Sequence, residues 1–368
     1  MRFPRTAQHR TQLAALAVAV AIGLGFVLTA CGIPSSDSAP SQAGSGKRHK
    51  IVLSLNNIAV SQRLQGANGA AYVARTKYRN SVDFQVKVSE DTVSAQIASL
   101  QQIIRDKPDA ILINAASEAA LTQVLTQACH AGIVVVNFDQ QAANVPCTYR
   151  RPYVPADYSA DAAQWMCKQL NGDGKIYLDQ GIAGLPTTTL VENVVTSTFA
   201  STCPKVSVVA NYQSQYSVGT EIAAVSALLS SHPDVTGVIS NAYCTGVIQA
   251  FQRAGHTPVP TVCGATNGNA IACSDAKVPC FQWGVPSATA SVALRTAVNV
   301  LEGKPEPREV PGYDTDYILN SGTAFTHKLP VSTMTAGKDF FPGQSPDLLL
   351  PVTLEDFGIT PSVALSGS

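Results

Sequence analysis

Polar side chains follow several apolar runs of this chain, and their types suit ligand recognition better than bond-making chemistry. Most carry amides, and one carboxylate, Asp139, stands among them. Amides and hydroxyls both donate and accept hydrogen bonds, as do the hydroxyls of a sugar or polyol. We therefore expect ligand contacts from Asn57, Asn114, Asp139, Gln140, Asn241, Tyr243, Thr266 and Asn267.

The sequence patterns of common catalytic, metal and nucleotide sites are missing. The six histidines are scattered without metal-ligand spacing, and there is no Gly-x-Ser-x-Gly segment. Asp314 and Asp316 fit a surface turn better than an acid/base pair, and residues 181–184, Gly-Ile-Ala-Gly, lack the third glycine and the Lys-Ser/Thr of phosphate loops. We expect a protein that is not an enzyme and that holds no cofactor or metal.

Short apolar runs alternate with stretches of helical periodicity. Continuous apolar strands between helices indicate an α/β fold whose parallel sheet is covered on both faces. In such sheets ligands bind beyond the carboxyl ends of the strands. Strands are predicted at residues 51–55, 83–88, 110–114, 133–138, 175–179, 206–212, 235–240 and 261–265, and helices at 61–77, 93–105, 118–130, 157–170, 190–202, 219–230, 245–254 and 289–301.

The two halves of the chain echo one another. Lys-Pro-Asp at 107–109 and His-Pro-Asp at 232–234 each lead into a buried strand, and the two strands end in Asn114 and Asn241. This echo favours two similar α/β lobes, and a body of more than ~300 residues favours two lobes over one core. Independent convergence on the same helix–turn–strand chemistry is the alternative.

The N-terminus has the pattern of an export signal. Arg2, Arg5 and Arg10 precede an apolar run at 13–30 that is too short for a membrane span of ~20 residues. Leu28-Thr29-Ala30-Cys31 resembles the bacterial lipoprotein signal, in which the cysteine is lipidated and becomes the new N-terminus. This implies an extracytoplasmic protein, lipid-anchored to the outer face of the bacterial cell membrane; an uncleaved N-terminal anchor is the alternative.

Composition bounds the remaining segments. The chain is 45% hydrophobic and 14% charged, with formal net charge +0, which argues against a nucleic-acid partner. Residues 31–49, rich in Ser, Pro, Ala and Gly, read as a flexible tether. Beyond residue 305, helical periodicity stops. We expect a short strand at 331–334 and an extended tail over 336–368, of which residues 353–368 are partly disordered.

Eight cysteines remain if Cys31 carries lipid, an even number that indicates disulfides in an exported protein. No C-x-x-C spacing suggests another use, and eight cysteines allow 105 pairings. We expect pairing between sequence neighbours: Cys129–Cys147, Cys167–Cys203, Cys244–Cys263 and Cys273–Cys280.

Five short segments occur in an order that is typical of one family: 53–57 (Leu-Ser-Leu-Asn-Asn), 111–114 (Ile-Leu-Ile-Asn), 135–139 (Val-Val-Asn-Phe-Asp), 181–184 and 232–235. Over residues 50–305 the chain resembles the type I periplasmic sugar-binding proteins, of ribose- and galactose-binding type, that serve ABC importers. The resemblance implies two Rossmann-like lobes joined by three strands near 154–157, 283–287 and 310–317, with the ligand in a cleft that closes on binding.

The implied organisation has five parts. A signal peptide spans 1–30 and the tether 31–49. The N-terminal lobe takes 50–154 plus 287–312, the C-terminal lobe 155–284 plus 315–335, and the tail 336–368. The resemblance also implies a monomer with two partners, a small-molecule ligand and an ABC permease.

The resemblance assigns roles to single residues. Asn57, Asn114 and Asp139 align with ligand contacts of the family, and Tyr216 with an aromatic ring that stacks on the sugar. Asp157 lies at an expected hinge and is a further candidate.

Other positions depart from the family pattern. Ala59 and Val60 replace aromatics, Gln140 and Thr189 replace arginines, Thr266 replaces an aspartate and Gly284 a glutamine. Charge-assisted hydrogen bonds are thereby lost, so we expect another sugar or polyol, or a less polar metabolite, rather than ribose. Trp283 and Tyr243 are candidates to replace the missing rings.

Each candidate has a structural alternative. Asn114, Asp139 and Asp157 could cap helices, and Tyr216 and Trp283 could pack in a core. A sensory binding protein that serves a membrane receptor, or an extracellular enzyme on the same scaffold, are the alternative functions. A transcription regulator is disfavoured because no helix-turn-helix precedes Lys50.

Overall fold

The computed structural model describes residues 47–59, 61–117, 119–140, 142, 145–151, 156–182, 186–283, 288–309, 329–350 and 357–368. They belong to one compact unit, Gly46–Ser368. Cys31, the signal peptide, most of the tether and most of the three expected lobe connections lie outside the described residues.

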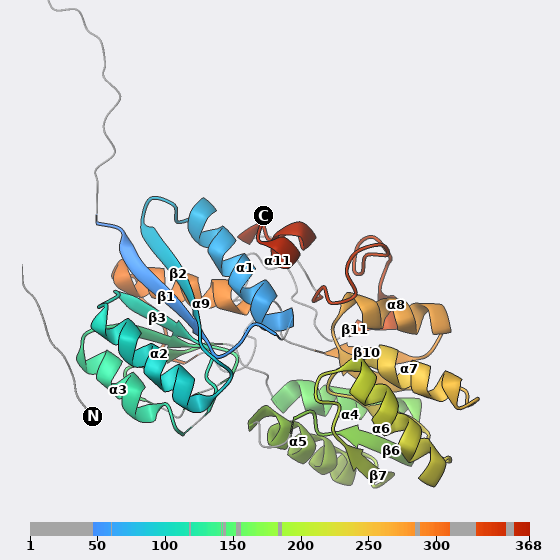
Figure 1. Cartoon of the computed structure of the whole chain (residues 1–368). Coiled ribbons are helices and arrows are strands. Elements are labelled where there is room, and N and C mark those ends of the chain that lie inside the picture. The colour runs from blue at the N-terminus through green and yellow to red at the C-terminus, as the bar shows by residue number, and fades with distance from the viewer. Residues whose placement is uncertain are drawn as a thin grey trace, which may run out of the picture. The chain divides into compact units, whose positions relative to one another are not determined.

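The first sheet (sheet A) is entirely parallel and forms the centre of the N-terminal lobe. Its strands are β1 (His49–Leu55), β2 (Val82–Val88), β3 (Ala110–Ile113), β4 (Val134–Asn137) and β5 (Thr148–Arg150), in the order β2-β1-β3-β4-β5 (Figure 1). Ile113 pairs with Asn137, so β3 and β4 end side by side. Asn114 and Asp139 follow these two ends.

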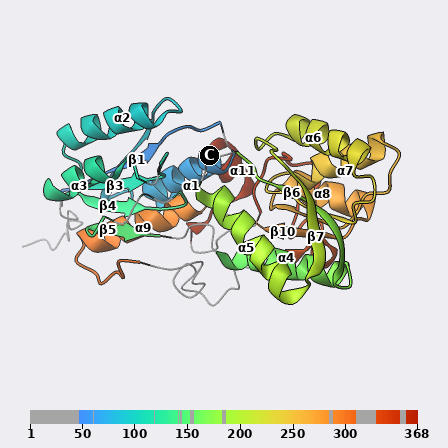
Figure 2. The same ribbon diagram turned by 90° about the horizontal axis from the view of Figure 1, so that it is seen from below.

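Strand β1 shows why both faces of sheet A are covered. Its alternate side chains Ile51, Leu53 and Leu55 pack with residues of α1 (Ser61–Thr76) and α9 (Thr289–Leu301). Val52 points the other way, toward α2 (Val93–Arg105) and α3 (Thr122–His130). Figure 2 shows these two helical layers on either side of the sheet. Successive side chains of a strand point to opposite faces of the sheet, so β1 contributes to two separate apolar cores.

The second sheet (sheet B) repeats this plan in the C-terminal lobe. Its strand order is β11-β10-β9-β8-β6-β7, and the short β11 alone runs antiparallel among these strands. The strands are β6 (Asp173–Asp179), β7 (Lys205–Tyr212), β8 (Gly237–Ile239), β9 (Thr261–Gly264), β10 (Cys280–Trp283) and β11 (Leu329–Pro330).

Five helices cover sheet B: α4 (Ala156–Gln169), α5 (Pro186–Thr202), α6 (Val218–Ser231), α7 (Cys244–Arg253) and α8 (Asn267–Ala276). Ile176 and Leu178 of β6 pack with residues of α4 and α5, whereas Tyr177 between them packs with residues of α6 and α7. The two parallel-sheet α/β lobes confirm the predicted fold class.

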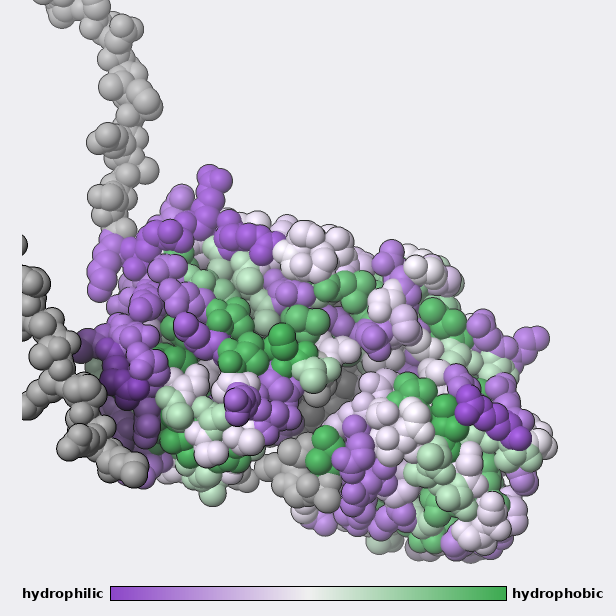
Figure 3. Space-filling view, in the orientation of Figure 1, coloured by the Kyte–Doolittle hydropathy of each residue, from purple (hydrophilic) through white to green (hydrophobic). Residues whose placement is uncertain are grey.

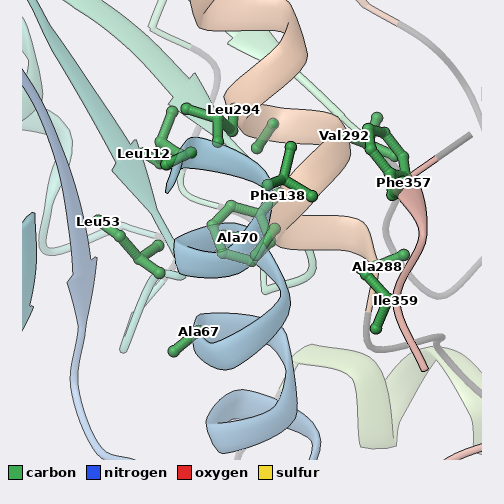
Figure 4. Close-up of a cluster of buried hydrophobic side chains, with 14 of the residues drawn as sticks. Leu53, Ala67, Ala70, Leu112, Phe138, Ala288, Val292, Leu294, Phe357 and Ile359 are labelled. Carbon is green, nitrogen blue, oxygen red and sulfur yellow. The ribbon is translucent and has the colours of Figure 1, made fainter. Parts of the chain in front are cut away.

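The C-terminal residues differ from the extended, partly disordered tail that composition predicts. Residues 361–366 form α11 (Pro361–Ser366), which packs on α1 and buries Val363 and Ala364. Ile359 lies so close to α1 that a Cβ on Gly69 would meet its Cδ1 at 2.9 Å. Figure 4 shows Ile359 beside Ala288 and Phe357 beside Val292 in one apolar cluster. Apolar residues in the described tail thus complete a core.

The prediction of a strand at residues 331–334 is wrong. Val331–Thr333 form a 3-10 turn, η1, and the strand that pairs with β10 is Leu329–Pro330 just before it. The side chain of Val331 is buried among the cysteines of the C-terminal lobe, which explains why the segment is apolar without being a strand.

All four expected disulfides are present. Cys129 pairs with Cys147, Cys167 with Cys203, Cys244 with Cys263, and Cys273 with Cys280. Each bridge joins two segments of the same lobe.

Most large apolar side chains are buried, but Ile58, Leu64, Val86 and Val88 are exposed. Figure 3 shows apolar side chains on the face formed by β2 and the start of α1. Among the described residues, no helix is long and apolar enough to cross a bilayer.

Candidate functional site

Two of the predicted ligand residues form a pair at the carboxyl edge of sheet A. The side-chain amide of Asn114 donates to Oδ2 of Asp139 at 2.7 Å. Both side chains are buried, with 1% and 4% of their surface exposed. Oδ1 of Asn114 is a buried acceptor without a hydrogen-bond partner, and so is Oδ1 of Asn57 at the end of β1. Buried acceptors normally have partners, so this edge presents two that a ligand hydroxyl would satisfy.

Two buried amides that the sequence did not single out position this pair. Gln96 of α2 donates to the carbonyl of Asn114 at 2.8 Å and accepts from the amide of Ala116 at 2.8 Å. Asn137, the last residue of β4, donates to the carbonyls of Ile113 and Gln140. A polar side chain at a core position of an amphipathic helix is the signal that would have found Gln96.

The surroundings of Asp139 bear on its charge. Burial raises the pKa of its carboxyl above the ordinary value, while the charge of Arg63 and hydrogen bonds from Asn114 and Gln62 oppose that rise. Its backbone is left-handed, with φ at 55°, a region in which aspartate and asparagine are the best tolerated after glycine.

The helix-cap alternative fails for Asn114. Helix α3 begins at Thr122 with Leu121 as its N-cap, seven residues after Asn114. For Asp139, the next element is β5, and among the described residues no helix begins between them.

A small hollow opens next to the pair. It encloses ≈ 190 Å³ of unfilled space, part of it open to solvent, and its walls include Gln62, Arg63, Asn114, Phe138 and Thr289. These residues come from the start of α1, the ends of β3 and β4 and the start of α9. Gln62 and Arg63 are not among the predicted ligand residues, because neither follows a predicted strand and the family resemblance assigns neither a ligand contact.

On sheet B, Asp179 organises the matching edge. Its Oδ1 accepts the backbone amides of Gly181 at 2.8 Å and Ser214 at 2.9 Å, and its Oδ2 accepts that of Asn241 at 3.0 Å. The side chain of Asn241 returns a bond to the carbonyl of Asp179 at 2.6 Å. Asp179 therefore fixes three loops, and the side-chain amide nitrogen of Asn241 is already used.

Tyr216 is held beside this edge by an unusual backbone. Gln215 and Tyr216 both have positive φ, 53° and 50°, in a region that bulky side chains rarely adopt. A Cβ at Gly181 would meet the Tyr216 hydroxyl oxygen at 2.9 Å, so only glycine leaves room for it there. Burial and the negative charge of Asp179 raise the pKa of Tyr216 to about 12. Strained residues of this kind gather at binding sites, which supports a ligand role for Tyr216.

The charges of the N-terminal lobe also reach Tyr216. The carboxylate of Asp139 raises its pKa and Arg63 lowers it. The three side chains therefore interact electrostatically across the two lobes.

Four other candidates remain accessible. Gln140, Asn241 and Tyr243 are half-buried, and Thr189 on α5 is exposed. Burial raises the pKa of Tyr243. Asp157 lies in the first turn of α4, which begins at Ala156, and its side chain is outside the described residues. The helix predicted over residues 157–170 therefore begins and ends one residue earlier than expected.

Three candidates have structural partners instead. The Thr266 hydroxyl caps α8 by accepting from Asn269, and the Trp283 indole donates to the carbonyl of Ser240 at 3.3 Å from within an apolar core. The amide of Asn267 is fully buried: it accepts from the Phe341 backbone at 2.7 Å and donates to the Phe341 carbonyl at 2.9 Å. These contacts explain the three side chains without a ligand.

A cluster of three cysteine sulfurs in the C-terminal lobe has the spacing of a metal site but not its chemistry. Sγ atoms of Cys244, Cys263 and Cys273 lie within 4.8 Å of one another. All three are in disulfides, so none offers the thiolate that a metal requires.

Comparison with known proteins finds similar sequences over most of the chain. A family model described as periplasmic binding protein domain matches residues 57–305. A D-ribose/D-allose-binding protein of Pseudomonas aeruginosa is 26% identical over 298 residues, which is 78% of this chain and 92% of the relative.

Solved structures share the fold. An ABC transporter solute binding protein from Thermobispora bispora is 25% identical with a TM-score of 0.66, covering 84% of this chain and 94% of that one. A solute binding protein from Actinobacillus succinogenes with bound D-allose is 18% identical with a TM-score of 0.61, covering 74% and 100%.

Proposed function

The chain belongs to the family of periplasmic binding proteins, a family that binds solutes and catalyses no reaction, and from this premise we propose that it captures a sugar or polyol and delivers it to an ABC importer. The ligand would be held between the carboxyl edges of sheets A and B. Contacts to both edges would favour a closed arrangement of the lobes, since a ligand stabilises whichever state it binds better.

The buried Asn114–Asp139 pair is the observation that carries the proposal. A buried carboxylate bonded to an amide, next to unsatisfied amide oxygens, offers several acceptors within a small space. A polyhydroxyl ligand supplies the matching donors. An apolar ligand would leave these groups unpaired, at about 1–3 kcal/mol for each.

The names of relatives support the ligand class. The relative from Pseudomonas aeruginosa is described as binding D-ribose and D-allose, and a structure from Shewanella holds L-arabinofuranose. The departures at Gln140, Thr189 and Thr266 argue that the sugar here is not ribose itself.

A thermal-shift screen of the compact unit Gly46–Ser368 tests the proposal. D-allose, L- and D-arabinose, D-ribose, and polyols of the same length are the first ligands. A ligand at ~100 times its Kd adds about 2.7 kcal/mol of stability, which raises Tm by several degrees. Binding of another class of metabolite, with no response to any sugar or polyol, would contradict the proposal.

The proposed anchor is a lipid on Cys31. Phase separation in a detergent that clouds on warming should place the mature protein in the detergent phase, and Cys31→Ala should move it to the aqueous phase. Equal partitioning of both would contradict lipidation.

A further inference from the structure

We propose that Arg63, at the start of α1, binds the ligand and balances the charge of Asp139, so that the site selects an uncharged polyhydroxyl ligand. This inference rests on the proposed function and adds a residue and a selectivity to it. Arg63 is not among the ligand residues predicted from the strand ends or from the family resemblance.

The position of Arg63 is the first argument. Its side chain is half-buried and lines the hollow beside Asn114 and Phe138. Its charge acts on Asp139 on one side and on Tyr216 on the other. Among the described residues Arg63 forms no ion pair within 4 Å. Arg63 thus lines the site, and among the described residues no carboxylate forms an ion pair with its guanidinium.

The second argument is that helix α1 itself does not favour a cation there. The N-terminus of a helix carries a partial positive charge, which disfavours arginine in the first turn. Helix α1 has no acidic residue in its first turn to offset this. The reason for an arginine at this position therefore lies outside the helix, at the edge of sheet A where Asp139 is buried.

The third argument concerns the charged side chains at the carboxyl edges of sheets A and B. Both oxygens of Asp179 accept backbone amides, so this carboxylate belongs to the loops. Among the described residues of the site, Arg63 and Asp139 carry the other two charges, and these oppose one another. A sugar acid would bring an additional negative charge next to a described cation that a buried carboxylate already opposes. A neutral sugar keeps the balance.

The role of Arg63 also accounts for a departure from the family pattern. Gln140 and Thr189 stand where sequence resemblance places arginines that clamp the sugar. Arg63 would supply a planar, multi-donor group from a different element, aimed at the same ligand.

Calorimetric titration of the full chain with the best neutral sugar tests the inference. Arg63→Ala should raise Kd by about tenfold or more, since a hydrogen bond to a charged group is lost. The Kd of Arg63→Lys should lie between those of the parent and Arg63→Ala, because lysine keeps the positive charge but lacks the planar, multi-donor guanidinium. Arg105→Ala on the exposed end of α2 is the matched control and should leave Kd unchanged.

Two further readouts separate ligand binding from a structural role. In the Asp139→Asn background, where there is no charge for Arg63 to balance, Arg63→Ala should leave the sugar-free Tm unchanged or raise it, because alanine suits the first turn better than a cation. The parent should bind the neutral sugar at least about tenfold more tightly than the corresponding aldonic acid, and Asp139→Asn should narrow that ratio.

The outcomes are distinct. A parent that binds no sugar or polyol would overturn the proposed function and this inference with it. A parent that binds sugar while Arg63→Ala binds equally well, or that prefers the aldonic acid, would overturn the inference alone.

Discussion

Asp139 is the residue on which the site depends most directly. Asparagine is the substitution to make, because it tolerates the left-handed backbone at φ 55° and removes only the charge. We expect Asp139→Asn to weaken sugar binding by about 1.5–3 kcal/mol, the contribution of a hydrogen bond to a charged acceptor. Calorimetry measures this loss, and Asp83→Asn on the exposed side of β2 is its control. Equal affinity of Asp139→Asn and the parent would remove the carboxylate from the site.

Sequence reasoning at the residue scale can bring together side chains that lie near the ends of their own strands. The rule that the carboxyl ends of neighbouring parallel strands meet predicts that Asn114 and Asp139 lie close together, and a 2.7 Å hydrogen bond joins them. Asn267 was predicted by the same rule, but its amide bonds to the backbone of Phe341, 74 residues away. No local sequence pattern predicts a hydrogen-bond partner 74 residues away.

At the scale of elements, the C-terminal segment 341–350 is held from two directions. Gln65 of α1 donates to the carbonyl of Asp347 at 2.6 Å and accepts from the amide of Leu349 at 3.0 Å. On the other side, Asn267 at the start of α8 holds Phe341, and its own backbone amide donates to Leu348. One segment thereby bonds to helices of both lobes.

Asn267→Ala tests this attachment. The substitution leaves the Phe341 amide without its side-chain partner, whereas the Phe341 carbonyl still accepts from the backbone amide of Gln344. One unsatisfied buried group costs about 1–3 kcal/mol, so urea unfolding should show a loss of at least about 1 kcal/mol. Asn193→Ala, at an exposed position of α5, should change stability by less than about 0.5 kcal/mol. A similar small change in both variants would show that the segment is held without Asn267.

The disulfides offer a second test at this scale. The Cys167–Cys203 bridge spans 36 positions and the Cys273–Cys280 bridge 7. If the bridges act mainly by restricting the unfolded chain, their removal should cost about 4 and about 2 kcal/mol respectively. Paired cysteine-to-alanine variants, compared by urea unfolding, measure the order. A larger loss from the shorter loop would mean that contacts in the folded state dominate instead.

Over the whole molecule, the alternation of strands and helices could be predicted because each strand of a parallel sheet carries its own apolar pattern. Residues 93–105 match α2 from end to end. The pattern fails after residue 305, where β11 and α11 are too short to show periodicity and are stabilised by distant contacts. Tertiary packing, rather than local propensity, forms these elements.

The free energy of unfolding should depend on pH because of one buried acid in the C-terminal lobe. Glu221 of α6 is fully buried and accepts a hydrogen bond from the hydroxyl of Tyr212. Burial and the charge of Asp179 raise its pKa to about 8 from its ordinary 4.5. Between these two values the folded chain holds a proton that the unfolded chain has released. Stability from this group is therefore complete below pH ~4.5 and is lost as pH rises toward ~8.

Glu221→Gln removes the titration while keeping the shape of the side chain. The stability of the parent minus that of the variant should therefore fall steadily between pH 5 and pH 8, by up to about 1.4 kcal/mol for each pH unit, and stay level above pH ~8. Urea unfolding at half-unit steps gives this difference. Glu90→Gln, at an exposed position after β2, should give a curve parallel to that of the parent. If Glu221→Gln is parallel as well, the carboxyl is ionised in the folded protein, and its neighbours must compensate the buried charge.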